Sequence, residues 1–555
     1  MSFFSRCLLA LFLFVQGAHA QRALNTWSDY LSYYEGQSLD KWDDEVYVAA
    51  GNGIFIYNET DNSISRLSKV NGLSDIGITT LAVNEVGDFL IVGYQNGNLD
   101  IIRDREITNF TAIKNSTVIG DKSIRHIRFR DNVAYLSTGV GIIVFNTERL
   151  EVSETYNISA AGGIEINQTT ILNDTIYAAT NEGLYMANLN EDLTIFANWQ
   201  QDLSIPSPFE NVAHIGEYGG LLYLNQRTIE NAGVYRRQDG SWNSIIGTDD
   251  IISIKESAGG LAINASYFTR YYNENGEILL TLSDYGVEPN MRANQAIRDT
   301  SGVLWLTDRF RGLVRYTEEE GYQFIAPEGP GKNSAFDLEI SDGTLWVAGG
   351  SPTHPGTWSN RFETNGFYKY REGKWLNFLR EDYPVLDQES LFDIPIAYPD
   401  PDNPDRAYVG SWFSGLVTVE GDEILDLYDE NNSSLGLRED YPSADWVGVA
   451  GIRKDGEGNI WMTNGFANEP LSVWKTDGTW ESFNLFLGSN QLLLDLIINQ
   501  DGNLWMVRNR GGVVAFSYGE SINSTIDDGV TIFEAGAGNG EIGRASCRER
   551  VCHRV

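Results

Sequence analysis

Arginine and aromatic residues gather in short polar turns in the second half of the chain. The matching turns of the first half are plain: residues 50–53, 94–97 and 138–141 read AGNG, YQNG and TGVG. From residue 304 onward the turns instead carry Arg309, Arg311, Trp358, Arg361, Trp412, Phe413, Arg508 and Arg510. Guanidinium groups bind phosphate or carboxylate at two points, and aromatic faces stack on sugar rings. These residue types predict a site for an anionic glycan.

A structural role competes with ligand binding for the same residues. Trp, Phe and Arg are also enriched where protein surfaces meet, so these turns would equally suit a seal between two parts of the chain. Both interpretations stay open at this point. Four other tryptophans lie inside apolar runs and are expected to pack in the core: Trp305, Trp346, Trp461 and Trp505.

Other chemistry is not indicated by the sequence. His126, His214 and His354 are far apart, and neither an H-E-x-x-H nor a C-x-x-C metal signature is present. The 77 Asp and Glu residues do not single out a catalytic pair, and the G-x-S-x-G turn of serine hydrolases is missing. We therefore expect a protein that is not an enzyme, with no catalytic residues, no metal and no cofactor.

The turns belong to a phrase that recurs about every 45 residues, a period typical of repeat folds. An apolar run, a polar turn with a glycine and a second apolar run form this phrase, as in residues 46–57 and 407–419. Each repeat divides into four strand candidates joined by tight turns. This pattern predicts an all-β fold of β-propeller type, in which the turns between the second and third strands surround one mouth of the ring.

Eleven repeats can be counted, which is too many for one ring. They start near residues 38, 78, 123, 166, 211, 251, 291, 334, 389, 444 and 489. Since propellers usually have four to eight blades, we expect tandem rings of seven blades, the second incomplete because the chain would be truncated. The segment 26–33 reads as a lone strand that would complete a final blade of the first ring.

The boundary between the rings is predicted from the character of the turns. Because the turns change at residues 291–333, we expect the first propeller over residues 21–290 and the second over residues 291–540. The alternative, in which residues 291–333 close the first ring, stays open.

Both ends of the chain differ from the repeats. Residues 1–20 read as a signal peptide, with Arg6, a short apolar run and the cleavage pattern Ala18-His19-Ala20. Residues 541–555 are Arg-rich and read as a non-native, adaptor-derived tail. Cys7 lies in the expected signal peptide, and the other two cysteines, Cys547 and Cys552, lie in this tail, so the exported body is expected to contain no disulfide.

Charge and hydropathy limit the partners. The formal net charge of −37 argues against nucleic-acid binding, which requires a basic surface. No later stretch of about 18 apolar residues is present, so no membrane-spanning segment is expected.

Two features resemble known families of Bacteroidetes. The phrase SDGTLW (341–346), repeated as QDGNLW (500–505), resembles the propeller repeat of two-component regulators. A signal peptide, the start Trp27-Ser28-Asp29-Tyr30, weak early repeats, sharper later ones and a body without cysteine are together similar to the PorZ family of the type IX secretion system.

The PorZ resemblance implies a specific role. It implies two seven-bladed propellers and a C-terminal sandwich, before which this sequence ends. It also implies a location on the outer-membrane cell surface, reached through the periplasm. The expected partners are anionic lipopolysaccharide or polysaccharide, a sortase, and outer-membrane proteins of the secretion complex. Two other functions stay open: the sensor propeller of a polysaccharide-responsive regulator, and a propeller lyase or sialidase.

Overall fold

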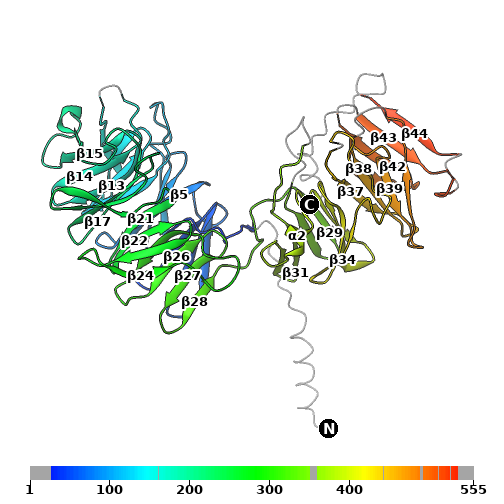
Figure 1. Cartoon of the computed structure of the whole chain (residues 1–555), viewed down its shortest axis with the longest axis horizontal. Coiled ribbons are helices and arrows are strands. Elements are labelled where there is room, and N and C mark those ends of the chain that lie inside the picture. Colours follow the sequence, from blue (N-terminus) through cyan, green and yellow to red (C-terminus); the bar gives the residue numbers. More distant parts are fainter. Residues whose placement is uncertain are drawn as a thin grey trace, which may run out of the picture.

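The protein consists almost entirely of four-stranded antiparallel sheets. The computed structural model describes residues 27–159, 162–350, 359–441, 443–487, 492–509, 512–519, 521–524 and 527–534. These residues form eleven four-stranded sheets, each with its strands in sequence order across the sheet. The sheets make two bodies (Figure 1). The predicted all-β tandem-propeller fold is confirmed, whereas the expected signal peptide (1–20) and tail (541–555) lie outside the described residues.

Seven sheets form the first body, called ring one. Its strands are β1 (Ser38–Trp42), β2 (Glu45–Ala50), β3 (Gly53–Asn58), β4 (Ile64–Ser68), β5 (Ile78–Asn84), β6 (Phe89–Tyr94), β7 (Leu99–Arg103), β8 (Glu106–Phe110), β9 (His126–Arg130), β10 (Val133–Thr138), β11 (Gly141–Asn146), β12 (Glu151–Tyr156), β13 (Ile166–Leu172), β14 (Thr175–Thr180), β15 (Gly183–Asn188), β16 (Gln200–Gln201), β17 (Val212–Tyr218), β18 (Leu221–Gln226), β19 (Gly233–Gln238), β20 (Ser241–Ile246), β21 (Ile251–Ser257), β22 (Gly260–Ala265), β23 (Phe268–Tyr272), β24 (Ile278–Leu282), β25 (Ala293–Arg298), β26 (Leu304–Asp308), β27 (Gly312–Thr317) and β28 (Gly321–Ile325). A 3₁₀ turn, η1 (Phe196–Asn198), precedes β16.

Four sheets form the second body, called ring two. Its strands are β29 (Asp337–Ser341), β30 (Thr344–Ala348), β31 (Phe367–Arg371), β32 (Lys374–Phe378), β33 (Ile396–Asp400), β34 (Asn403–Ser411), β35 (Gly415–Glu420), β36 (Glu423–Tyr428), β37 (Gly448–Lys454), β38 (Ile460–Gly465), β39 (Leu471–Trp474), β40 (Trp480–Phe483), β41 (Leu493–Ile498), β42 (Leu504–Arg508), β43 (Gly512–Ser517) and β44 (Gly529–Phe533). One short helix, α2 (Val385–Gln388), connects β32 to β33. None of the described helices is long and apolar enough to cross a membrane.

Asp and Asn residues make the tight turns between the first two strands of many blades. Asp43, Asp131, Asn173 and Asp342 adopt φ of 52, 52, 54 and 44°. This left-handed conformation costs Asp and Asn less than most residues, because their short side chains bond to the neighbouring backbone. The alternation of such turns with buried apolar runs explains why the repeat in the sequence folds as successive hairpins.

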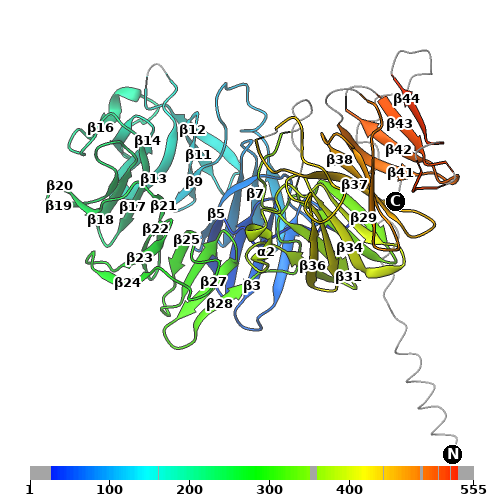
Figure 2. The same ribbon diagram turned by 45° about the vertical axis from the view of Figure 1, so that its right-hand side comes forward.

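Ring one is closed by its seventh sheet, β25–β28. Gln295 Oε1 accepts hydrogen bonds from Ser38 Oγ at 3.1 Å and from the Leu39 amide at 3.2 Å. Lys41 Nζ lies 2.8 Å from Asp299 Oδ2. Both figures show β27 and β28 beside the blue strands of the first sheet (Figures 1 and 2).

Closure of ring one moves the predicted domain boundary. One apolar cluster joins the first and seventh sheets, with Leu39, Phe55, Ile297 and Trp305 all buried. Residues 291–333 therefore contribute to ring one, the alternative that the sequence left open, and the boundary lies after Ile325 rather than at residue 290. The reason is that the apolar face of β25–β28 is buried against the first sheet.

The N-terminal segment 27–37 lies between the rings and joins neither as a strand of a sheet. Tyr33 is fully buried against Phe55 of ring one, with ring centroids 6.0 Å apart. Tyr30 packs on Tyr370 and Trp375 of ring two, at 5.1 and 5.8 Å. The expectation that this segment completes a blade is corrected: its aromatic side chains are instead divided between the two bodies.

The Asn333 side chain anchors segment 27–37, and removing this side chain should make the segment more mobile. The side chain accepts a hydrogen bond from the Ser32 amide at 2.8 Å and donates one to the Ser32 carbonyl at 3.1 Å. Asn333→Ala should lower the free energy of unfolding by about 1 kcal/mol and speed hydrogen exchange of the peptide that contains Ser32. Trp27→Ala is the control, because Trp27 is 86% exposed. Equal exchange in both variants would contradict the role given to Asn333.

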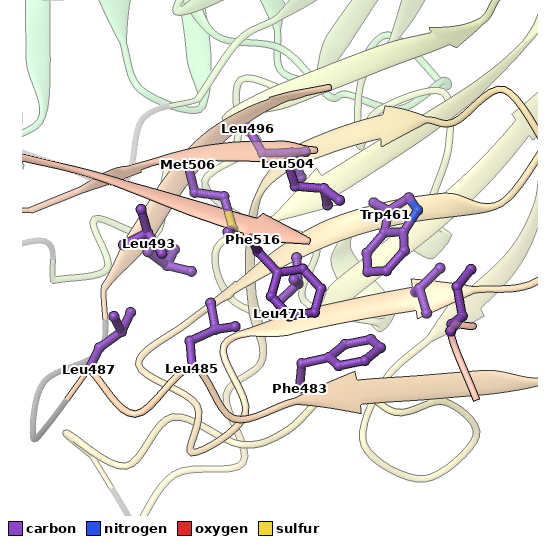
Figure 3. Packing of buried hydrophobic residues seen from close by; sticks show 13 residues of the cluster. Trp461, Leu471, Phe483, Leu485, Leu487, Leu493, Leu496, Leu504, Met506 and Phe516 are labelled. Carbon is purple, nitrogen blue, oxygen red and sulfur yellow. The ribbon is translucent and has the colours of Figure 1, made fainter. Parts of the chain in front are cut away.

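The sequence predicted that four tryptophans pack in the core, and three of the four are buried between the blades. Trp305, Trp346 and Trp461 are fully buried. In the last described sheets of ring two, Trp461 packs with Phe483 and Phe516 in a cluster of leucines (Figure 3). Trp505 is only partly buried and stacks on Phe533 at 5.3 Å.

Candidate functional site

The predicted site residues are divided between the two rings. Arg309 and Arg311 lie on the turn between β26 and β27, in ring one. Arg361, Trp412, Phe413 and Arg508 lie in ring two. Trp358 and Arg510 fall outside the described residues. The single ligand-binding mouth predicted from the turns is therefore corrected to two separate places, because residues 291–333 close ring one.

The two arginines of ring one have different environments. Arg311 donates hydrogen bonds to the carbonyls of Glu288 (2.6 Å) and Pro289 (3.1 Å) and stacks over Phe324 at 4.3 Å. It holds a neighbouring loop in place. Arg309 is exposed at the edge of the central cavity of ring one and has no ion-pair partner within the described part of the chain. Only Arg309 is therefore available to a ligand here.

Trp412 lies in the core of ring two, and the expectation that it faces a ligand is corrected. Its exposed fraction is 0%. The backbone of Gly465 packs so closely on its ring that an added Cβ would lie 2.2 Å from the indole. The guanidinium of Arg438 lies over the indole ring, with its Cζ 5.1 Å from the ring centroid. Trp412 is thus a core residue of ring two.

Five aromatic residues of ring two contact one another, and we call them the Phe362 cluster: Phe362, Phe392, Phe413, Tyr441 and Trp446. Phe362 contacts Phe413 at 5.6 Å and Trp446 at 6.0 Å between ring centroids. Phe392 lies 5.4 Å from Phe413, and Tyr441 stacks on Trp446 at 4.8 Å. Phe362 and Tyr441 are 51% and 53% exposed. The cluster offers an aromatic platform to solvent.

A buried carboxylate holds Phe362 on the surface. Asp393 is fully buried and accepts hydrogen bonds from the amides of Arg361 (2.9 Å), Phe362 (3.0 Å) and Glu363 (2.8 Å). Phe362 itself adopts φ of 60°, an unusual conformation for a bulky residue. Burial raises the pKa of Asp393, although the three amides act in the opposite direction. Backbone strain of this kind is concentrated at functional sites.

Arg361 brings a positive charge to the edge of the cluster. Its side chain is 53% exposed, and its Nε lies 3.1 Å from Glu363 Oε1. Arg508 lies on the last described sheet, where it contacts Glu534 at 3.4 Å and the Leu487 carbonyl at 3.2 Å. Of the predicted residues, Arg361 and Phe413 are brought together, and Arg508 belongs to a different sheet.

Arg438 is a charged residue that the sequence did not single out. Its side chain is 2% exposed and makes two hydrogen bonds to Asp440, at 3.0 and 2.8 Å. A third hydrogen bond reaches Asn360 Oδ1 at 2.8 Å, next to Arg361. The guanidinium also stacks over Phe466 at 4.7 Å. Arg438 therefore ties the loop that carries Phe362 to the rest of ring two.

The sequence missed most of the Phe362 cluster. Phe362, Phe392, Tyr441 and Trp446 lie outside the turns between apolar runs on which the prediction was based. Two local features could have indicated these residues. Phe362 directly follows Arg361, and Trp446 immediately precedes an apolar run. The contacts among them, however, join three connections that are far apart in the chain.

A second site is the central cavity of ring one, with a volume of about 840 Å³. His126 and His214 occupy equivalent positions on the inner strands of two blades and both line this cavity. Burial lowers the pKa of each to about 3, so both imidazoles are neutral at pH 7. The sequence had indicated no metal signature for these histidines. In the described ranges, no group of three or more His, Cys, Asp or Glu residues is placed to hold a metal ion.

The histidine pKa values predict loss of stability in acid. An unfolded histidine titrates near 6.5, so the unfolded chain binds more protons than the folded one between about pH 6.5 and pH 3. Each histidine should therefore remove about 1.4 kcal/mol of stability per pH unit over this range. Denaturant unfolding at pH 7 and pH 4.5 measures this, and the loss should be smaller in His126→Gln. An unchanged pH dependence in that variant would refute the assignment.

Comparisons with known proteins agree with the fold. Residues 46–200 match the family model described as the PorZ N-terminal β-propeller domain of the type IX secretion system. The solved structure of PorZ, a surface component of that system in Porphyromonas gingivalis, is 20% identical with a TM-score of 0.78, covering 92% of this chain and 68% of that chain. The resemblance to PorZ inferred from the sequence is thereby confirmed.

Other solved structures are less similar. The extracellular domain of a hybrid two-component system from B. thetaiotaomicron is 15% identical, covers 86% of this chain and 73% of that chain, and has a TM-score of 0.38. That of a one-component system from the same organism is 16% identical, covers 90% and 66%, and has a TM-score of 0.33. No curated protein sequence matches this chain.

Proposed function

We propose that this chain is a PorZ-type component of the type IX secretion system, a non-catalytic platform that binds anionic lipopolysaccharide or polysaccharide and docks a sortase complex. The match of residues 46–200 to the PorZ N-terminal propeller supports the assignment to this system. The signal peptide expected at residues 1–20 agrees with export through the periplasm to the outer-membrane surface. The proposal concerns a binding function, and the two rings provide the surfaces.

The Phe362 cluster is the observation that carries glycan binding. Exposed aromatic faces such as Phe362 and Tyr441 stack on the apolar faces of sugar rings. Arg361, next to them, suits a phosphate or carboxylate group of the same glycan. Strain at Phe362 and its three-fold anchoring on Asp393 explain how a large apolar residue is kept facing water.

Binding of purified anionic lipopolysaccharide to the immobilised protein tests the glycan site. Phe362→Ala and Arg361→Ala should each weaken binding about tenfold, which corresponds to about 1.4 kcal/mol. Phe209→Ala is the matched control, since Phe209 is 72% exposed on ring one. Equal affinities of the Phe362 and Phe209 variants would remove the cluster from the proposal.

The remaining parts of the proposal need separate measurements. Co-purification of the sortase with the tagged protein from outer-membrane extracts tests docking independently of the glycan. Cell fractionation and surface labelling test the location. Cleavage of envelope glycans by the purified protein would contradict a non-catalytic role.

A further inference from the structure

The central cavity of ring one differs in chemistry from the Phe362 cluster. Amide, hydroxyl, imidazole and charged side chains line it, together with isoleucine, leucine and alanine side chains. None of its lining residues is Phe, Tyr or Trp, although 12% of the chain is aromatic. Since sugar-binding sites commonly use aromatic platforms, this composition favours another kind of ligand.

The cavity is deep along the inner strands. The six consecutive residues 77–82 all contribute to its wall, as do residues 252–255 on the other side. At about 3.3 Å per residue, residues 77–82 extend over about 16 Å. An extended peptide of about five residues has the same length, because it has the same rise per residue.

Several polar atoms of the wall lack a partner. His126 Nδ1 and His214 Nε2 are buried and make no hydrogen bond within the described part of the chain. Gln37 and Gln95 present exposed amide groups at the rim. Neutral imidazole and amide groups offer both donors and acceptors. A peptide backbone needs this mixture, because each of its residues carries an N–H and a C=O group.

Arg309 is the charge of the cavity that remains available. Glu35 is paired with Lys332 at 3.3 Å, and Arg125 with Glu165 at 2.8 Å. Lys255, which also lines the cavity, is paired with Asp40 at 3.7 Å. Arg309 is exposed and has no carboxylate partner among the described residues, in a chain with a net charge of −37. A guanidinium in such surroundings binds a carboxylate.

We propose that the central cavity of ring one binds an extended acidic peptide segment, with its backbone along His126 and His214 and a carboxylate on Arg309. This is a second binding activity, separate from glycan binding at the Phe362 cluster, and it does not rest on that proposal. The length of the cavity, its unpartnered polar atoms and its lack of aromatic residues favour a peptide over an oligosaccharide.

A peptide library tests this inference on the full chain. The immobilised protein is exposed to a mixture of hexapeptides with random residues around a fixed central Glu, and to the same mixture with a fixed Gln. Mass spectrometry of the retained peptides should show at least tenfold enrichment of the Glu mixture. Arg309→Ala should abolish this enrichment, and the double variant Gln37→Ala, Gln95→Ala should reduce retention several-fold.

The controls separate the possible outcomes. Arg149→Ala removes another exposed arginine, on the turn between β11 and β12, and should leave retention unchanged. All these substitutions are at exposed positions, so folding should be preserved. Equal retention of the Glu and Gln mixtures, or equal retention by wild type and Arg309→Ala, would overturn the inference. So would binding of a glucuronic acid hexamer to the cavity in place of any peptide.

Discussion

Asp393→Ala should destabilise ring two by about 3–5 kcal/mol and abolish binding at the Phe362 cluster. The substitution leaves the amides of Arg361, Phe362 and Glu363 without their common acceptor. Without these hydrogen bonds, nothing compensates the strain of a φ of 60° at Phe362, so we expect its backbone to relax. Urea unfolding followed by tryptophan fluorescence measures the change, since nine of the fourteen tryptophans lie after residue 325.

The conservative variant Asp393→Asn separates the two effects of this substitution. Its amide keeps one oxygen acceptor and the volume of the side chain, so stability should lie between wild type and Asp393→Ala. Glycan binding should still fall, because the amide nitrogen cannot accept the bond from at least one of the three backbone groups. If both variants bind as wild type does, the anchoring of Phe362 by Asp393 is irrelevant to function.

Arg438→Ala should cost ring two about 3 kcal/mol, because the buried guanidinium loses its charge-assisted hydrogen bonds to the partly exposed Asp440. The substitution leaves Asp440 without its two hydrogen bonds and opens space between Trp412 and Phe466. Arg438→Lys keeps the charge but not the planar fork, so it should recover only part of the loss. Unfolding in guanidinium chloride provides the comparison.

An exposed arginine serves as the control for Arg438. Arg380 is 44% exposed and lies 3.5 Å from Asp387. Arg380→Ala should change stability by less than about 1 kcal/mol, as is usual for surface ion pairs. Similar losses for Arg380→Ala and Arg438→Ala would show that burial of Arg438 adds nothing.

The blades were predictable because their signal is local. Units expected to start near residues 166 and 251 begin at Ile166 and Ile251 in the structure. Each hairpin combines an apolar run with an adjacent turn residue such as Asn173, so a short window of sequence is sufficient. Assignment of a blade to a ring depends instead on distant contacts, such as that of Gln295 with Ser38, which periodicity does not encode.

The candidate site was predictable only in part, for a related reason. Trp412 and Phe413 are neighbours in one turn, and the sequence treats them alike. In the structure Trp412 is buried under Arg438, while Phe413 joins the surface cluster. This difference in exposure depends on side chains that come later in the chain, such as Arg438 and Trp446. Residue types therefore indicated aromatic and cationic chemistry, but not which side chains would be exposed.

The closing contact of ring one also determines how the ring can fold. Ser38 and Gln295, which hydrogen bond at 3.1 Å, are 257 residues apart in the chain. Closing so long a loop costs more conformational entropy than forming any single hairpin, and contacts of this kind slow folding. Six sheets can therefore form by local pairing while the ring stays open. We therefore expect docking of β25–β28 onto the first sheet to be a late and slow step, which completes the central cavity at the end of folding.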